Sequence, residues 1–201
     1  MPKTDLRSFL KVRTFHRHKR IDARFSRFDL ASLDGYARFL LAHSIAVRSA
    51  LPVAAEFVRS ELHHDMPDYH AMIGEDLASL PLKTRPLADA GWHSDNEHPS
   101  ATAGLTYVLL GSRLGLAALF EQYRRSVAWD HPIHTSAFIR DRVGISLWRA
   151  FLDWSAALPC EDVDPVIALR GAQACFDLYT EAGRIAEAAE LAQIKGVHIR
   201  A

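Results

Sequence analysis

Residues 101–120 read ATAGLTYVLLGSRLGLAALF, and this stretch decides the fold. Its apolar residues, among them Leu105, Val108 and Leu109, recur at spacings of three and four, which is the period of an amphipathic α-helix. The same period recurs earlier in the chain, whereas sustained alternation at period two, the pattern of a half-buried strand, is absent. The sequence therefore predicts an all-α protein.

Capping residues and helix breakers divide the chain into expected helices. Ser32 and Ser100 are expected helix starts, and so is Asp164 followed by Pro165. The expected helices span residues 5–27, 32–49, 52–64, 68–80, 100–128, 135–157 and 165–194. The proline-rich segment 81–99 is expected to be the one long irregular connection.

The composition fits one ordinary globular domain, because 49% of the 201 residues are hydrophobic and 24% are charged. We expect a single domain over residues 1–201, folded as a multi-helix bundle. The 24 basic residues balance 24 acidic ones, so neither nucleic acid nor a membrane is expected as a partner. The N-terminus lacks a signal-peptide core, and two cysteines, Cys160 and Cys175, fit a reducing compartment. We therefore expect a soluble cytoplasmic protein.

Charge is uneven along the chain, because basic residues far outnumber acidic ones between Lys3 and Arg27. Two interpretations of this basic helix stay open: a solvated face, or a surface for a local anionic ligand.

His18 is expected to face inward on the first helix, because Thr14, His18 and Ile21 follow one another at steps of four and three. His16 is turned about 200° from His18 and is expected on the solvent side. An inward histidine is either a core residue with satisfied hydrogen bonds or a ligand, and imidazole is a good ligand of heme iron.

Lys11 lies two helical turns before His18, about 10 Å along the axis and on nearly the same face. This spacing suits a cofactor with an iron at its centre and carboxylates at its edge. The alternative is a lysine whose aliphatic stem covers apolar surface while its ammonium reaches water.

Gly104, Gly111 and Gly115 form a stripe without side chains along one face of the helix quoted above. Each glycine inside a helix costs about 1 kcal/mol relative to alanine, so three in register need a reason. Either another helix packs closely against the stripe, or a flat ligand lies against it. Ser112 offers a hydroxyl that can hold a water molecule near such a ligand.

Two motifs in this chain resemble those of a known family. HKRID at residues 18–22 matches H-x-x-[IL]-D, and YVLLGSRLG at residues 107–115 matches Y-V-L-x-G-S-x-L-G. Both resemble bacterial biliverdin-producing heme oxygenases, notably those found with bacteriophytochromes. The likeness continues through residues 25–40 and 148–176, so that it covers most of the chain.

The resemblance implies a heme-oxygenase-like fold and a set of site residues. His18 corresponds to the metal ligand, the proximal ligand of the heme iron. Gly111, Ser112 and Gly115 correspond to the catalytic distal helix, whose bend lets heme and oxygen fit between two helices. The remaining heme-binding positions are Lys11 and Arg149, which match cations that meet the propionates, and Tyr107, which lines the pocket.

The sequence departs from the family pattern at three of these distal positions. Leu110 stands where an acidic residue is frequent, and Leu116 stands where a second glycine is frequent. Ser112 aligns with the aspartate that orders distal water in animal members. A bulky Leu116 is expected to narrow the pocket.

The implied activity is that of an oxidoreductase that cleaves heme with O2 and external electrons to biliverdin, ferrous iron and carbon monoxide. Heme is then both substrate and cofactor. The implied partners are an electron donor such as ferredoxin or a reductase, and a bilin-binding photoreceptor that receives the product. Two alternatives stay open: a heme-binding or heme-sensing protein without turnover, and a helical interaction protein in which the glycine stripe only packs.

Overall fold

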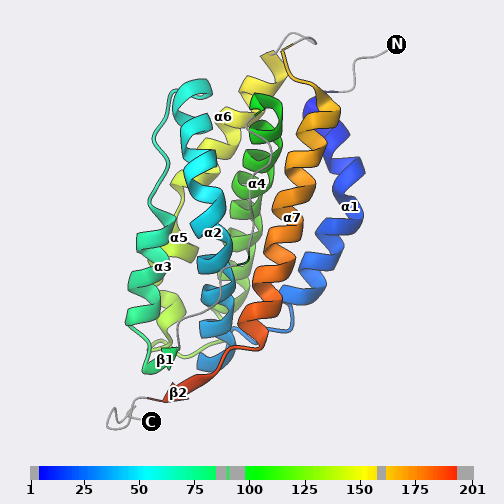
Figure 1. The fold of residues 1–201 in the computed structure, drawn as a ribbon. Helices are drawn as coiled ribbons and strands as arrows, with labels where there is room; N and C mark the ends of the chain where they lie inside the picture. The colour runs from blue at the N-terminus through cyan, green and yellow to red at the C-terminus, as the bar shows by residue number, and fades with distance from the viewer. Residues whose placement is uncertain (1–4, 85–89, 91–97, 158–161, 194–201) are drawn as a thin grey trace.

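Figure 1 shows the computed structural model of the chain, which describes residues 5–84, 90, 98–157 and 162–193. Within these residues the structure is an all-α, multi-helix bundle, as predicted. The elements are α1 (Leu6–Phe25), α2 (Leu33–Glu61), α3 (Tyr69–Ala78), β1 (Leu82–Thr84), α4 (Pro99–Tyr123), η1 (Pro132–His134), α5 (Ala137–Arg140), α6 (Val143–Ala157), α7 (Pro165–Glu187) and β2 (Leu191–Gln193).

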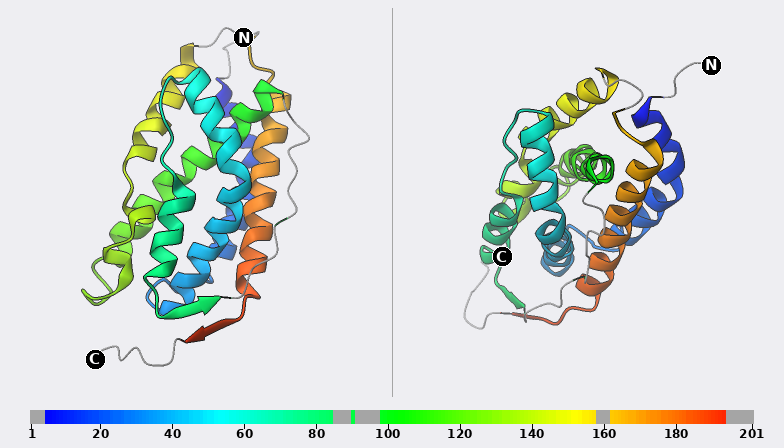
Figure 2. Two further views of the ribbon diagram at one scale, coloured as in Figure 1. Left: turned by 60° about the vertical axis from the view of Figure 1, so that its left-hand side comes forward. Right: turned by 45° about the horizontal axis from the view of Figure 1, so that its top comes forward.

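The long helices α2, α4 and α7 pack against one another at the centre of the bundle. Helix α1 packs on the outer side of α7, and α6 packs against α4 on the other side (Figure 2). Helices α1, α4 and α7 run in the same direction, opposite to α2 (Figure 1).

The main apolar core joins the central helices and includes Tyr36, Phe39 and Leu109. A second apolar cluster lies between α2, α4 and α6, around Phe57 and Trp148. Helices α2 and α4 are long and apolar enough to cross a membrane by length and composition, but about half of each apolar window is buried in the bundle. A core helix gives the same signal, so this finding does not indicate a membrane span.

Two of the three expected helix starts are confirmed. The Ser32 hydroxyl accepts the Gly35 amide at the start of α2, and the Asp164 carboxylate accepts two amides at the start of α7. The expected start at Ser100 is wrong, because α4 begins one residue earlier, at Pro99. The Ser100 hydroxyl instead accepts the backbone amide of Asp164, which ties α7 to α4.

The expected break between residues 49 and 52 is also wrong, because α2 runs through Pro52 without interruption. Proline inside a helix removes one backbone hydrogen bond and costs about 3 kcal/mol. Ala50 and Ala54, on either side of Pro52, are fully buried. Burial of both halves of the helix therefore offsets the cost of the proline.

The helix expected over residues 135–157 is two helices, α5 and α6, separated at Asp141. The Asp141 carboxylate accepts the amides of Val143 and Gly144, each at 3.0 Å, and so caps the start of α6. This side chain competes with the helical hydrogen bonds that would have joined the two segments.

The last helix ends at Glu187 rather than at residue 194, and a short strand follows. Nη1 of Arg38, on α2, donates to the carbonyls of Ala186, Glu187 and Ala189 at 2.8–2.9 Å. These bonds satisfy carbonyls that a helix end leaves without partners. Strand β2 then pairs antiparallel with β1, which lies in the segment expected to be irregular. Most of that segment is outside the described residues.

Candidate functional site

His18 does not face inward as expected, because its side chain is 65% exposed. The reason is helical drift. Each step of four residues advances 40° beyond a full turn, so the three steps from Leu6 to His18 accumulate about 120°. Leu10 and Thr14 are buried, and His18 stands at the edge of their stripe. The prediction that His16 lies on the solvent side is confirmed.

The imidazole of His18 is held by two contacts. Its Nδ1 lies 2.9 Å from Oδ2 of Asp22, one turn further along α1. Because a carboxylate only accepts hydrogen bonds, Nδ1 is the protonated nitrogen and donates. The ring also packs edge-on against Phe176 of α7, with the ring centroids 5.9 Å apart. In the neutral form of the ring, this hydrogen bond leaves the lone pair of Nε2 available to a ligand.

The other edge of α1 is an ion-pair seam with α7. Asp177 accepts Arg17 and Arg20 at 3.3 and 3.0 Å, and Glu187 accepts Arg24 and Arg27 at 2.7 and 3.3 Å. Phe176 is buried, whereas its neighbour Asp177 is half exposed. His18 therefore lies on the edge of α1 that is turned towards the interior side of α7.

Lys11 is exposed on the same face of α1 as His18, as the helical spacing predicts. Arg7, one turn before Lys11, also belongs to this edge, because its guanidinium is near enough to Tyr107 of α4 to lower the pKa of that phenol. Burial outweighs this effect and raises the pKa of Tyr107. Sequence reasoning missed Arg7, because the proximity of α1 to α4 is not visible from one helix.

The glycine stripe divides into two parts. A Cβ built on Gly104 would lie within 1.7 Å of the carbonyl oxygen of Ala168, in the backbone of α7. Gly171 of α7 meets the backbone of Ala101 in the same way, with a built Cβ at 1.9 Å. At this upper end the stripe is a close helix-packing surface, which confirms that interpretation for Gly104 only.

Further along α4 the stripe is less covered. A Cβ on Gly111 would touch only the ring of Trp148, at 3.5 Å, and a Cβ on Gly115 would meet nothing within 4 Å. Leu114 beside Gly115 is 45% exposed. Tyr107 lies at the upper edge of this part, with its ring centroid 5.5 Å from that of Trp148. Of the two glycines where a flat ligand was expected, Gly115 leaves the backbone of α4 open, whereas the ring of Trp148 lies over Gly111.

His18 and Gly111 lie at similar heights in the bundle. On α7, Ala172 faces Gly104, and Phe176 lies one turn beyond Ala172, about 6 Å along the axis. On α4, Gly111 lies two turns beyond Gly104, about 10 Å along the axis. Since the two helices run in the same direction, Phe176 and Gly111 are about one turn apart in height. His18, which contacts Phe176, therefore shares this level.

The Ser112 hydroxyl donates its proton to the carbonyl of Leu109, at 2.7 Å. A serine bonded in this way to its own helix keeps acceptor capacity but has no proton left to donate. The expected role in holding water is restricted to accepting a hydrogen bond.

The two leucine departures do not act on the open part of the stripe. Leu110 is fully buried in the cluster around Trp148, and Leu116 is buried in the main core. Neither side chain is on the accessible face that carries Gly115. The expectation that Leu116 narrows a pocket stays a prediction.

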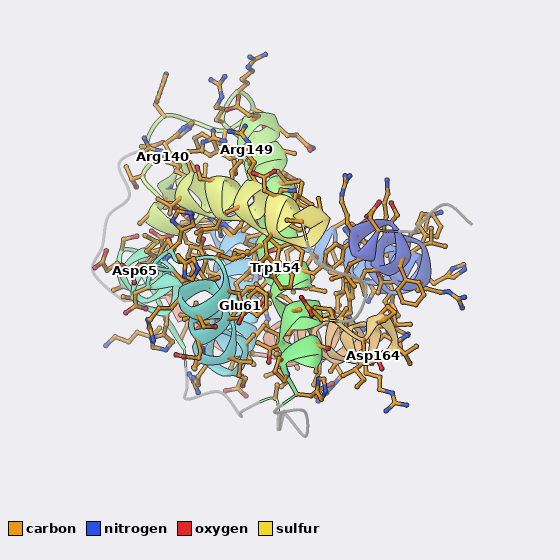
Figure 3. The ribbon with its side chains drawn as sticks, turned by 90° about the horizontal axis from the view of Figure 1, so that it is seen from above. Glu61, Asp65, Arg140, Arg149, Trp154 and Asp164 are labelled. Atoms are coloured by element: carbon orange, nitrogen blue, oxygen red, sulfur yellow. The ribbon has the colours of Figure 1, made fainter. Side chains whose placement is uncertain are left out.

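Arg149 is not brought to the His18 side of the bundle. It lies on the exposed face of α6 with Ser146 and Asp153, whereas its neighbour Trp148 turns inward to Gly111. Figure 3 shows Arg149 on the outer side of α6 and Trp154 on the inner side.

Of the two cysteines, Cys175 is buried and free, and Cys160 lies outside the described residues.

A buried ion pair sets the position of α6 beside α4, and sequence reasoning missed it. Arg113, whose side chain is 1% exposed, lies with Nη2 3.4 Å from the carboxylate of Asp141, and this carboxylate also accepts the hydroxyl of Tyr69. The guanidinium is between the rings of Tyr69 and Phe138, 4.5 and 4.7 Å from their centroids. The same aspartate caps α6, so the pair fixes the helix that presents Trp148 to Gly111.

No protein-family model matches this chain, and no curated protein sequence matches it significantly.

Proposed function

We propose that this protein is a heme oxygenase, an enzyme that opens heme to biliverdin with release of ferrous iron and carbon monoxide. The proposal also includes the expected partners, O2, an electron donor such as ferredoxin or a reductase, and a bilin-binding photoreceptor, and it includes a cytoplasmic location. It rests on the two motifs and on how well their residues suit heme.

The observation that carries the proposal is the state of His18. An exposed imidazole whose Nδ1–H donates to a carboxylate is oriented, and Nε2 keeps its lone pair. Histidines that bind metals are commonly held in this way by a second group, which also makes the ligating nitrogen more basic. A heme iron needs only one such protein ligand on its proximal side. Among the described residues there is no group of three His, Cys, Asp or Glu side chains that could hold a metal ion. A heme site does not require such a group.

Other residues suit the rest of a heme molecule. Lys11, two turns from His18, and Arg7, one turn beyond Lys11, supply cations on the edge of α1 that carries His18, and cations suit the propionates. The open backbone at Gly115, next to Gly111 under the ring of Trp148, suits a flat ring with a small molecule above it. Heme, when bound, supplies the iron that activates oxygen, and the protein then orients the ring and limits which edge oxygen reaches.

A second candidate function is heme binding or sensing without turnover. The hydrogen bond from Ser112 to Leu109 favours it, because the hydroxyl has no proton to give to a distal water or to oxygen. Leu110 and Leu116 do not favour it, since both are buried away from the accessible face.

The first test is a heme titration of the parent, His18→Ala and His16→Ala proteins. His18→Ala is expected to lose the native axial-ligand spectrum, whereas His16→Ala, the matched control two residues away, keeps it. Asp22→Asn is expected to keep binding but shift the spectrum, because a neutral amide stabilises the imidazole less than a carboxylate does. Loss of the spectrum in His16→Ala alone would contradict the assignment of His18.

The second test is turnover with ascorbate or a ferredoxin system. Formation of biliverdin supports the oxygenase, and a stable heme complex without biliverdin supports the sensor. A helical interaction protein predicts no Soret band at all on addition of heme.

A further inference from the structure

The outward face of α1 carries two large exposed apolar side chains. Val12 is 72% exposed and Phe15 is 49% exposed. They are three residues apart, so they project in similar directions from the helix. Lys19, one turn beyond Phe15, places its Nζ 4.7 Å from the centroid of the Phe15 ring. We call Val12, Phe15, Lys19 and the exposed His16 the outward face. Arg13 is also exposed, but it lies one turn before Arg17 on the neighbouring edge, with its guanidinium 5.6 Å from the centroid of the Phe9 ring.

The charge of the outward face is positive. In the described structure no carboxylate pairs with Arg13 or Lys19, whereas the cations of the opposite edge are paired with α7. The acidic residue within α1 is Asp22, three residues after Lys19, and its carboxylate is bonded to the imidazole of His18. The cations of the basic helix that meet α7 are therefore paired, and Arg13 and Lys19 stand outside these pairs.

Shape separates the possible occupants. Helix α1 lies at the outside of the bundle and packs mainly on α7, so its outward face is convex (Figure 2). A stable protein interface needs about 800 Å² of complementary surface on each partner, with a central cluster of anchors. A lipid surface needs neither, because it adapts to a convex helix, takes up its apolar side chains and pairs headgroup anions with its cations.

We propose that the outward face of α1 docks on the surface of a phospholipid bilayer that contains anionic lipids. The net charge of zero excludes attraction of the whole molecule, but the local face decides peripheral binding. Phe15 lies three residues before His18, so docking brings the lipid surface next to the candidate heme site. Docking itself requires no heme, and its test is independent of the proposed function.

The experiment is co-sedimentation of the heme-free full chain with vesicles of phosphatidylcholine, with and without 30% phosphatidylglycerol, at low and at high salt. We expect binding to the anionic vesicles only, and weaker binding at high salt. Val12→Ser with Phe15→Ser is expected to weaken binding roughly tenfold or more, because both side chains leave the lipid. Arg13→Gln with Lys19→Gln is expected to weaken it about 25-fold, at about fivefold for each cation in the headgroup field.

Matched controls lie on α7. Val166 is 53% exposed and Arg170 is exposed, so Val166→Ser with Arg170→Gln removes the same chemistry from another surface. We expect this variant to bind as the parent does. All substituted side chains are exposed, and circular dichroism checks that each variant is folded.

Three results would overturn the proposal. They are no binding to anionic vesicles at low salt, equal binding to neutral vesicles, or parental binding by both α1 variants. Absence of binding to anionic vesicles at low salt would instead favour an acidic protein as the partner of the outward face. Loss of vesicle binding with an intact heme spectrum would locate any failure in the docking and not in the proposed function.

Discussion

The divided glycine stripe predicts opposite effects for the same substitution at two positions of α4. Gly104→Ala places a Cβ 1.7 Å from a backbone oxygen of α7, whereas Gly115→Ala places one in open space. Alanine stabilises a helix by up to about 1 kcal/mol relative to glycine at either position. Only Gly104→Ala must also separate two packed helices.

The magnitudes follow from these distances. To restore a contact of 3.0 Å at residue 104, the backbones must move apart by more than 1 Å, since the built distance is 1.7 Å. Overpacking costs typically 1 to 3 kcal/mol, and a backbone contact lies at the upper end, so Gly104→Ala is expected to lose about 2 kcal/mol net. Gly115→Ala is expected to gain about 0.5 to 1 kcal/mol. Gly111→Ala, in ordinary contact with Trp148, is expected to change stability little.

The assay is thermal unfolding of the heme-free proteins, followed by far-ultraviolet circular dichroism. In a chain of this length 1 kcal/mol shifts Tm by about 2–4 °C, so the two variants are expected to differ by at least about 5 °C. Heme affinity and biliverdin release are measured on the same samples, where Gly111→Ala and Gly115→Ala are expected to lower turnover. Equal stability of Gly104→Ala and Gly115→Ala would refute the packing argument. Full turnover in Gly111→Ala and Gly115→Ala would refute the ligand surface.

Three further predictions concern other parts of the chain. Burial lowers the pKa of His43 from 6.5 to about 4, so as pH falls from 6.5 to 4 a proton binds to this side chain in the unfolded state but not in the folded state. Over this window the free energy of unfolding of the parent, measured by urea unfolding at each pH, is expected to fall by about 3 kcal/mol more than that of His43→Gln. Equal pH profiles would contradict this prediction. His63 has a φ of 56°, a conformation that favours glycine. His63→Gly is therefore expected to raise the free energy of unfolding, measured with urea, by up to about 1 kcal/mol, whereas His63→Ala, which keeps a Cβ, is not. Lys11→Ala is expected to weaken heme binding about twofold to tenfold, and Lys11→Ala with Arg7→Ala to weaken it further, because exposed ion pairs are individually weak; unchanged affinity in the double variant, measured by titration at low salt, would exclude a propionate clamp on α1.

Much of the fold could be predicted because helix signals are local. The caps at Ser32 and Asp164 bond to amides two or three residues away, and the apolar period within each helix depends on that helix alone. Local signals also misled. Pro52 predicts a break that burial of both halves of α2 overrides, and the end of α7 depends on Arg38, which is 148 residues away from Ala186.

The candidate site shows the same division. The spacing of Lys11 and His18 on one face of α1 follows from the sequence, but the direction of that face does not, because drift along the helix and the ion-pair seam with α7 decide it. Arg113 and Asp141 carry no signal in sequence that would pair them, because residues 28 apart meet only when α4 and α6 pack.

The sequence by itself determined the all-α fold, the helix starts at Ser32 and Asp164 and which residues share a face within one helix, because these depend on hydrogen bonds and periods within a few residues. Only the tertiary structure decided what each face meets. Gly104 and Gly115 are both glycines on the same stripe of α4. The backbone of α7 covers Gly104, whereas nothing lies within 4 Å of a Cβ built on Gly115. The two helices touch over part of their length only, and where they separate depends on packing among segments far apart in the chain.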